Sequence, residues 1–311
     1  MRYLNTALNI GHRTLIPIEN LLIHHYSKEE IRYPPVFLIG APRTGSSILY
    51  EYITNDLEVN YINNLMCKFY ITLYIASIVS KIIFRNKQHN CFDSHQGMTK
   101  GLNSPSECGR FWYRWFPRDR HFVDFNELDI IQIKQIQEIV TALVNKHNKP
   151  LVIKNMNCGQ RLRVIRDVFP IALFIYCKRD PLFTAQSIIE TRERVFNNRL
   201  KWWSIMPKEY NDLVILDYPE QVVKQIYCIQ KQIEEDLCLF GEKQWIEIWY
   251  EDFCRSPRLI MDKVKNFFNQ NGTDVKYKAE VIEEKVHFSQ QRRIDSNTYN
   301  KLIEIINSLD W

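Results

Sequence analysis

Residues 34–47 read PPVFLIGAPRTGSS. The first half of this stretch, residues 34–40, is short, apolar and contains branched side chains, which is typical of a buried strand. Glycine, proline and hydroxyl residues then indicate a turn, and residues 46–53 follow with a helical pattern. The stretch therefore predicts a strand–turn–helix unit whose turn carries most of the polar groups.

The turn has the composition of an anion-binding loop. Gly45 allows a tight turn with the backbone close to a ligand, and the amides and dipole at the helix start favour an anion. Thr44, Ser46 and Ser47 add hydroxyl donors, and Arg43 adds a permanent charge with a forked donor set. These groups predict a site for phosphate or sulfate oxygens, with an ordinary turn and a capping serine as the alternative.

Strand and helix patterns alternate along the rest of the chain. Three further apolar runs predict strands at residues 151–154, 171–177 and 245–249. Helical periodicity lies between them, at residues 129–144 and 220–237, and Ser256-Pro257 opens another helix. The alternation predicts an α/β fold with a P-loop-like, mainly parallel sheet and helices on both faces.

We expect one α/β domain over residues 1–311, with its ligands at the carboxyl ends of the strands. Residues 85–125 and 191–215 fit the alternating plan poorly, so we interpret both as insertions over those strand ends, where an acceptor could sit. Trp202 and Trp203 in the second insertion could line an acceptor pocket or lid, or could be core residues.

Composition narrows the class of ligand. The chain has 311 residues, 45% of them hydrophobic, and a net charge of +5 without runs of like charge. This mild excess suits a small anionic ligand better than duplex nucleic acid, which would require a denser basic surface.

The eight cysteines show no C-x-x-C pair. They predict reduced core residues, no metal site and a reducing, cytoplasmic location.

Two segments bear on membranes. Arg2 is not followed by a continuous apolar stretch, so we do not expect a signal peptide. Residues 69–80 are uncharged and flanked by Lys68 and Lys81, but they are too short to span a bilayer. A buried helix is the simplest interpretation of this segment, and a helix in peripheral contact with lipid or lining an acceptor pocket is the alternative.

A second polar motif, Lys178-Arg179-Asp180-Pro181, ends the third predicted strand. Asp180 can N-cap the next helix with Pro181 in its first turn. Ser187, eight residues after Arg179, would lie about two turns into that helix. Arg179 and Ser187 could therefore meet a single phosphate group.

Together the two motifs resemble those of the sulfotransferases that use 3′-phosphoadenosine-5′-phosphosulfate (PAPS). Residues 42–47 (PRTGSS) match the family's 5′-phosphosulfate loop, P-[KR]-[ST]-G-[ST]-[ST], in the arginine form that is similar to bacterial and tyrosylprotein sulfotransferases. Arg179-Asp180-Pro181 with Ser187 resembles the family's 3′-phosphate element. An aromatic residue that often follows the loop in cytosolic sulfotransferases, and contacts adenine there, is Ile48 here.

The resemblance implies PAPS as the donor and 3′-phosphoadenosine 5′-phosphate as the product. It also implies further donor contacts from Tyr250, in a segment similar to the family's Y-E-D-[LF], and from a C-terminal region that closes over the donor. The complete set of donor-binding residues expected from the motifs is Arg43, Thr44, Gly45, Ser46, Ser47, Arg179, Ser187, Tyr250, Ser289, Arg292 and Arg293.

Sulfuryl transfer by in-line displacement needs fixed positive charge at the departing phosphate. Arg43 can supply it, and Lys154 resembles the family's lysine at that strand end. The acceptor also needs a base. We expect Glu107 to be this base, although Ser104 and Glu107 also have the spacing of a capping box that would only begin a helix. His95 and His121 are the next candidates.

Two other functions fit parts of the pattern. A P-loop nucleotide kinase or nucleotide triphosphatase shares the fold, but Ser46 occupies the position of its phosphate-binding lysine. A non-catalytic nucleotide-binding protein would keep the loop without transfer. For the sulfotransferase, the acceptor could be a small molecule, a glycan, a lipid or a peptide, and no oligomeric state is predicted.

Overall fold

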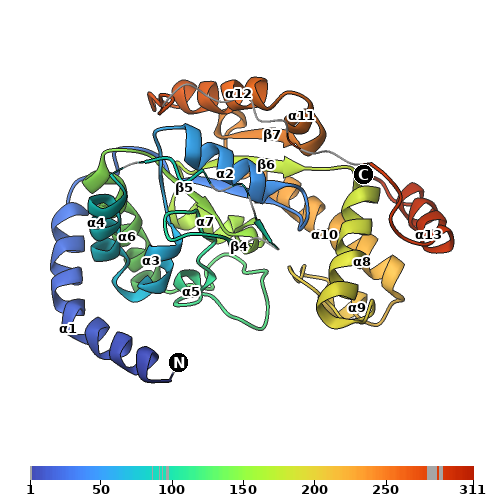
Figure 1. Ribbon diagram of the computed structural model, residues 1–311, viewed down its shortest axis with the longest axis horizontal. Coiled ribbons are helices and arrows are strands. Elements are labelled where there is room, and N and C mark those ends of the chain that lie inside the picture. The colour runs from blue at the N-terminus through green and yellow to red at the C-terminus, as the bar shows by residue number, and fades with distance from the viewer. Residues whose placement is uncertain are drawn as a thin grey trace.

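The structure, a computed structural model, describes residues 2–85, 87–90, 92, 94–95, 98–278, 286 and 290–311 (Figure 1). For residues 2–13, 94, 95 and 98 it describes the backbone only. A five-stranded sheet runs through the centre, in the order β2-β5-β1-β6-β7, and every neighbouring pair is parallel. Its strands are β1 (Val36–Gly40), β2 (Asn60–Tyr61), β5 (Leu151–Lys154), β6 (Leu173–Lys178) and β7 (Trp245–Trp249). The prediction of a parallel α/β sheet is confirmed.

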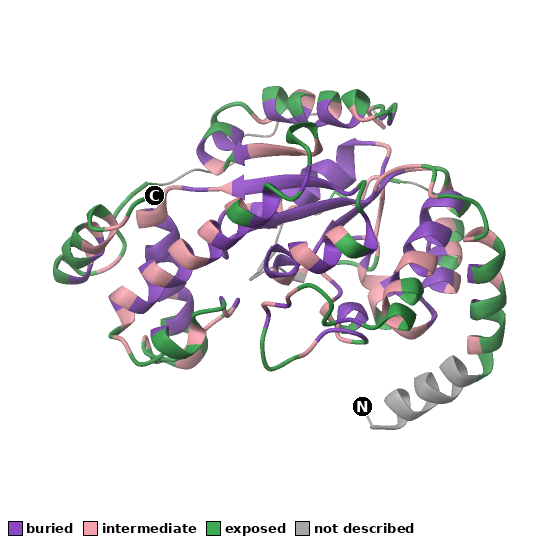
Figure 2. Ribbon diagram, turned by 180° about the vertical axis from the view of Figure 1, so that it is seen from behind, coloured by how far each residue is buried: buried purple, intermediate pink, exposed green. Residues whose placement is uncertain are grey.

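Both faces of the sheet are buried, because successive side chains of a strand point to opposite faces. In β1, Val36 and Leu38 belong to one hydrophobic cluster and Phe37 and Ile39 to the other. The first cluster lies under α2 (Ser46–Asp56), α11 (Tyr250–Arg255) and α12 (Pro257–Gln270), and the second lies over α6 (Ile130–His147), α7 (Leu162–Val168) and α10 (Tyr218–Leu237). Figures 1 and 2 show these two helical layers with the buried strands between them.

The remaining elements frame this three-layered core. They are the helices α1 (Arg2–Tyr26), α3 (Asn64–Lys68), α4 (Leu73–Phe84), α5 (Gly109–Trp112), α8 (Pro181–Phe196), α9 (Tyr210–Leu213) and α13 (Ser296–Asn307), the hairpin β3 (Ser94–His95) and β4 (Met98–Thr99), and the 3₁₀ turns Tyr70–Thr72, Met156–Gln160 and Glu242–Gln244.

The apolar segment at residues 69–80 forms the 3₁₀ turn Tyr70–Thr72 and most of α4, which is buried on one side only. Leu73 and Tyr74 are buried, whereas Ile82 and Ile83 on the same helix are largely exposed. The carboxylate of Glu19 in α1 accepts the backbone amides of residues 74 and 75, at 2.7 and 2.8 Å, and so caps the start of α4. None of the described helices is both long and apolar enough to cross a bilayer.

The interpretation of the cysteines needs one correction. The seven cysteines within the described residues are free, as expected, but they are not all core residues. Cys108, Cys158, Cys177 and Cys254 are buried, whereas Cys238 at the end of α10 is exposed. The apolar surroundings of a cysteine in the sequence therefore did not always indicate burial.

Candidate active site

Three basic residues meet at one edge of the sheet. Arg43 follows β1, Lys154 is the last residue of β5, and Arg179 follows β6 directly. Since β1 pairs in parallel with both β5 and β6, their carboxyl ends lie side by side. This is the edge at which open α/β sheets bind their ligands.

The loop between β1 and α2 is tight and strained. Gly45 has a φ of 79° and Arg43 a φ of 69°, a left-handed conformation that is costly for a residue with a side chain. The ring of Tyr250 lies so close to Gly45 that a Cβ atom at position 45 would collide with the ring edge. No side chain caps the start of α2. The first amides of α2 are therefore left without a capping side chain, as an anion site at a helix start requires.

One group of polar contacts joins the loop to the second motif. The Arg43 Nε donates to Ser187 Oγ at 2.9 Å, and Arg179 Nη1 donates to the Arg43 carbonyl at 3.1 Å. Asp180 caps α8 by accepting the amides of residues 182 and 183, and Pro181 is in the first turn, as predicted. The guanidinium of Arg179 also lies 4.7 Å from the ring centroid of Tyr250.

This group carries a concentrated positive charge. Burial, followed by the charges of Arg179, Arg194 and Arg293, lowers the pKa of Arg43, while Glu190 acts in the opposite direction. Glu190 forms an ion pair with Arg293 at 2.9 Å. The guanidinium groups of Arg43, Arg179, Arg194 and Arg293 thus outnumber the carboxylates that act on them, Glu190 on Arg43 and Glu251 on Arg179, an arrangement that a bound phosphate would stabilise.

Arg179 contains an unsatisfied donor. Its side chain is buried, with 9% of the residue exposed, and its Nε has no hydrogen-bond partner among the described atoms. A buried guanidinium nitrogen without an acceptor is costly, so this atom marks the place where an anionic ligand would fit.

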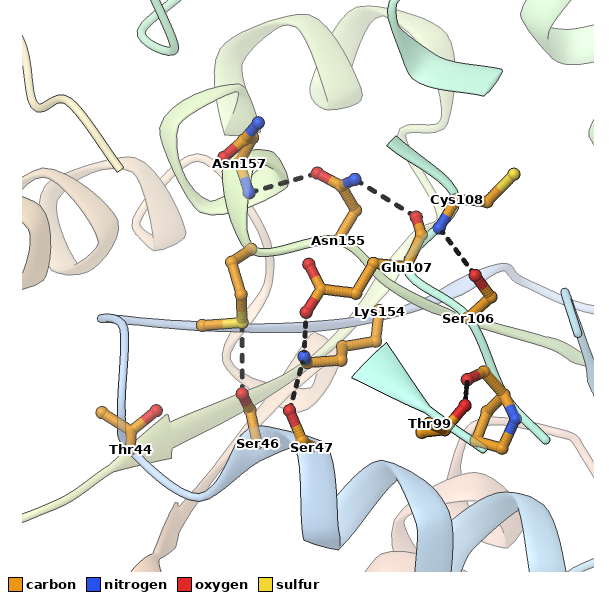
Figure 3. A network of polar contacts seen from close by, with 12 residues as sticks. Thr44, Ser46, Ser47, Thr99, Ser106, Glu107, Cys108, Lys154, Asn155 and Asn157 are labelled. Atoms are coloured by element: carbon orange, nitrogen blue, oxygen red, sulfur yellow. Dashed lines mark hydrogen bonds and ion pairs between the residues drawn. The ribbon is translucent and has the colours of Figure 1, made fainter. Parts of the chain in front are cut away.

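A second group surrounds Lys154 (Figure 3). Its Nζ donates to Ser47 Oγ at 2.9 Å and forms an ion pair with the carboxylate of Glu107. The Lys154 side chain is 3% exposed and that of Glu107 30% exposed. Asn155 Nδ2 donates to the Glu107 carbonyl at 3.2 Å and holds the backbone of this segment beside the end of β5.

Both groups line one pocket of about 310 Å³. Its walls combine the phosphate loop, the two basic groups and several apolar side chains: Pro42, Arg43, Gly45, Ser46, Ser47, Ile48, Glu107, Lys154, Met156, Asn157, Arg179, Trp203, Ser204 and Tyr250. The pocket therefore receives residues from both segments that the sequence analysis interpreted as insertions, through Glu107 and Trp203.

Glu107 does not belong to a capping box. Ser104 Oγ donates to the Lys100 carbonyl, and α5 begins only at Gly109, with Cys108 as its N-cap residue. The capping interpretation of Ser104 and Glu107 is therefore wrong, because the intervening chain does not start a helix.

The two histidines proposed as alternative bases are not part of the described pocket lining. His121 is buried, and its Nδ1 accepts the backbone amide of Met206 at 2.9 Å. Burial and then the charge of Arg161 lower the pKa of His121 to about 4. The side chain of His95 lies outside the described residues.

The other predicted donor-binding residues either bond to neighbouring protein groups, face solvent or lie outside the described residues. Thr44 Oγ1 donates to the Ala41 carbonyl at 2.9 Å, so its hydroxyl braces the loop, and Ser46 Oγ donates to Met156 Sδ at 3.2 Å. Arg293 joins α8 through Glu190, and Arg292 is exposed. Ser289 lies outside the described residues.

Sequence reasoning missed Arg194 and Asn157. Arg194 follows Ser187 by seven residues on α8, which is two helical turns and hence the same face. Asn157 comes three residues after the end of β5 and lines the pocket. A polar residue just after a parallel strand is a signal of a ligand site that could have identified it. The structure also separates the tryptophan pair: Trp203 lines the pocket, whereas Trp202 stacks edge-on against Tyr210.

Comparison with known proteins agrees with this geometry. Residues 34–274 match the model of the sulfotransferase family. The chain belongs to this family. Among curated sulfotransferases, the ω-hydroxy-β-dihydromenaquinone-9 sulfotransferases Stf3 of Mycobacterium bovis and Mycobacterium tuberculosis are both 22% identical to it over 246 residues, which is 72% of this chain. The match spans only 60% of the length of these relatives.

A solved sulfotransferase shares the fold. The crystal structure of a sulfotransferase from Alicyclobacillus acidocaldarius superposes with a TM-score of 0.50 and 14% identity, covering 89% of this chain and 93% of that one. The α/β fold predicted from the alternating strands and helices and the sulfotransferase family predicted from the two motifs are both confirmed. Family membership argues against a kinase or nucleotide triphosphatase.

Proposed function

We propose that this protein is an enzyme that transfers a sulfuryl group from PAPS to a hydroxyl or amine acceptor. The observation that carries the proposal is the position of Lys154. Its ammonium group contacts both Ser47 of the phosphate loop and the carboxylate of Glu107. One buried charge thus connects the donor loop with a candidate base.

The arginine group fits the 3′-phosphate that distinguishes PAPS from common nucleotides. Arg179 is buried and Arg43 is partly buried; Arg43 contacts Ser187, Arg179 contacts the Arg43 carbonyl, and Arg179 retains an unpaired Nε. The phosphate loop and the uncapped start of α2 would hold the 5′-phosphosulfate. In this arrangement Arg43 lies with the 3′-phosphate group rather than beside Lys154, so Lys154 is the principal cation for the leaving group.

The reaction follows from these positions. An acceptor oxygen or nitrogen attacks sulfur while the bond from sulfur to the 5′-phosphate oxygen breaks. The Lys154 ammonium stabilises the negative charge that builds on that phosphate oxygen. Glu107 accepts the proton of the acceptor. A bound donor would compete with Glu107 for Lys154, so donor binding would release the carboxylate for its role as base.

The acceptor side of the pocket is partly apolar, with Met156, Trp203 and Ile48 in its walls. The curated relatives are named for a hydroxylated menaquinone. Lipid-soluble alcohols are therefore the first acceptors to examine, ahead of sugars and peptides, and peripheral contact with a membrane would suit such acceptors. The cytoplasmic location and the single-domain organisation stay predictions.

The test is a transfer assay with sulfur-labelled PAPS and pools of lipid alcohols, sugars and peptides. We expect Glu107→Gln to lower turnover by about 10²- to 10⁴-fold and to leave affinity for 3′-phosphoadenosine 5′-phosphate nearly unchanged. The control is Glu138→Gln, which alters a surface ion pair on α6. Near-normal turnover of Glu107→Gln would remove Glu107 from the mechanism. Nucleotide binding without transfer to any acceptor would instead support the non-catalytic alternative.

A further inference from the structure

Two cysteine thiols meet directly behind the candidate base. Cys67 lies on α3, and Cys108 is the residue after Glu107. Two backbone hydrogen bonds join the segments that carry them. The amide of residue 106 donates to the carbonyl of residue 62 at 2.8 Å, and the amide of residue 64 donates to the carbonyl of residue 104 at 3.0 Å. This pairing places the two free thiols close enough for each to shift the pKa of the other.

The two thiols differ in access and in charge. Cys67 lines a second pocket of about 560 Å³ together with Lys68 and Arg110, whereas Cys108 is buried behind it. The hydrogen bond from Cys108, a further one from Ser106 and the charge of Arg110 lower the pKa of Cys67 against the opposing effect of burial. The same thiol pairing and burial raise the pKa of Cys108. Cys67 therefore has the features of an attacking thiolate, and Cys108 those of a resolving thiol.

We propose that Cys67 and Cys108 form a reversible oxidation site that takes hydrogen peroxide or a related small hydroperoxide. The Cys67 thiolate attacks the peroxide, an S–O bond forms as the O–O bond breaks, and one water leaves after protonation. Cys108 then attacks the sulfur of the sulfenic acid, the S–S bond forms, the S–O bond breaks and a second water leaves. Two thiols are oxidised by two electrons in total, and one peroxide is reduced to two waters.

The disulfide would move the candidate base, because a single peptide unit joins Cys108 to Glu107. This consequence rests on the function proposed above. An S–S bond of about 2.05 Å is shorter than any hydrogen-bonded contact of two sulfurs, so bonding draws Cys108 toward α3. Figure 3 shows the Cys108 side chain and the Glu107 carboxylate pointing in opposite directions. The movement would therefore pull Glu107 away from Lys154. Arg179 and Ser187 lie on separate elements and would keep the donor bound.

The experiment titrates the purified, reduced protein with hydrogen peroxide and follows three readouts. We expect the intact mass to fall by about 2 Da, the loss of two hydrogens that a disulfide requires, with a Cys67–Cys108 linkage in the peptide map. Turnover should fall by about 10²-fold, which is the effect of a small misplacement of a reacting group. Affinity for 3′-phosphoadenosine 5′-phosphate should persist, and a dithiol reductant should restore turnover.

Single substitutions separate the possible outcomes. Cys67→Ser should keep the turnover of the reduced protein and resist peroxide, and Cys238→Ser, which removes an exposed thiol, should behave as wild type. If both thiols remain open to alkylation, or if the disulfide joins other cysteines, the oxidation site is wrong. A Cys67–Cys108 disulfide with unchanged turnover would overturn the effect on the base. The mass and the peptide map decide the proposal even if the protein transfers no sulfuryl group.

Discussion

At the scale of single residues, the strongest evidence for a ligand is a donor without an acceptor. Arg179 is buried, its Nη1 is used by the loop carbonyl of Arg43, and its Nε is left unpaired. Proteins satisfy nearly all buried polar atoms, and those that remain unpaired often lie at functional sites. Arg179 contacts Arg43, which in turn contacts Ser187, and this chain of contacts is why our proposal assigns the 3′-phosphate to this corner of the pocket.

Arg179→Ala should weaken 3′-phosphoadenosine 5′-phosphate much more than adenosine 5′-monophosphate, which lacks only the 3′-phosphate. A charge-assisted contact of about 1.5–3 kcal/mol corresponds to a loss of about 10- to 150-fold. The affinities of the wild type and of Arg179→Ala are measured for both nucleotides, and the two losses of affinity are compared. General damage to the loop would weaken both nucleotides equally and so would not change the ratio of the two losses. Arg255→Ala, at an exposed ion pair, is the control. Equal losses for the two nucleotides would show that Arg179 recognises another group.

The sequence indicated which residues of the continuous motifs meet at this edge of the sheet, but not the directions of their side chains. Arg43, Arg179 and Ser187 could be predicted because each follows a strand end or a helix start at a fixed spacing. The sequence did not predict that the Arg43 side chain turns toward Ser187, since its left-handed backbone sets that direction. It also left two interpretations of Glu107 open, because a capping spacing has meaning only where a helix begins.

At the scale of elements, the loop and α11 are built to fit each other. Tyr250, the first residue of α11, lies on Gly45 so closely that only glycine leaves room for its ring. The same ring faces the Arg179 guanidinium at 4.7 Å. One aromatic side chain thus positions both the phosphate loop and the second basic motif.

Gly45→Ala should therefore weaken donor binding through a clash as well as backbone strain. Gly272→Ala is a matched control, because Gly272 has a φ of 76° but has nothing within 4 Å of an added Cβ. Both substitutions should lower the free energy of unfolding by about 1–2 kcal/mol through strain. We expect only Gly45→Ala to weaken 3′-phosphoadenosine 5′-phosphate, by about tenfold (1.4 kcal/mol) or more, in a binding titration. Similar binding by the two variants would contradict the close fit of loop and ring.

The central strands could be predicted because they are buried on both faces and read as continuous apolar runs. The predicted run 151–154 coincides with β5, which is buried along its whole length. The predicted run 245–249 coincides with β7, an edge strand that is only partly buried. The N-terminal helix α1 was not predicted. It contains Pro17, and its contacts are tertiary, such as the Asn145 side chain donating to the Tyr26 carbonyl at 3.1 Å. The edge strand β2 has two residues, too few for any periodicity.

At the scale of the whole molecule, buried polar groups tie the pocket wall to the core. The segment that contains Trp203 is held by His121, which accepts the amide of Met206, and by Gln225, whose Nε2 donates to the carbonyls of residues 203 and 205 at 3.0 and 2.8 Å. The fully buried Arg192 donates to Gln225 in turn. This segment of the pocket wall is therefore anchored by hydrogen bonds to buried side chains of the core.

His121 makes stability depend on pH. Its pKa of about 4 in the folded protein is below the ordinary 6.5, so the unfolded chain takes up the proton first. Its contribution to stability is fully present above pH 6.5 and is lost as the pH falls toward 4. Between pH 7.5 and 5 the loss attributable to this one group is about 2 kcal/mol.

We expect His121→Asn, whose Oδ1 can replace Nδ1 as the acceptor, to remove about 2 kcal/mol from the difference in unfolding free energy between pH 7.5 and pH 5. Urea unfolding at the two pH values measures this difference, with His24→Asn on the exposed side of α1 as the control. A pH dependence identical to that of the wild type would mean that His121 does not titrate as its burial implies.

The central claim is that the phosphate loop and the arginine group together hold an adenosine donor phosphorylated at the 3′ and 5′ positions. Calorimetric titration with 3′-phosphoadenosine 5′-phosphate, without magnesium, tests it most directly. The account predicts binding to one site per chain with a Kd below about 100 μM, or about −5.5 kcal/mol, and binding of ATP at least about tenfold weaker. Preferential binding of magnesium–ATP, with no heat from 3′-phosphoadenosine 5′-phosphate, would contradict it.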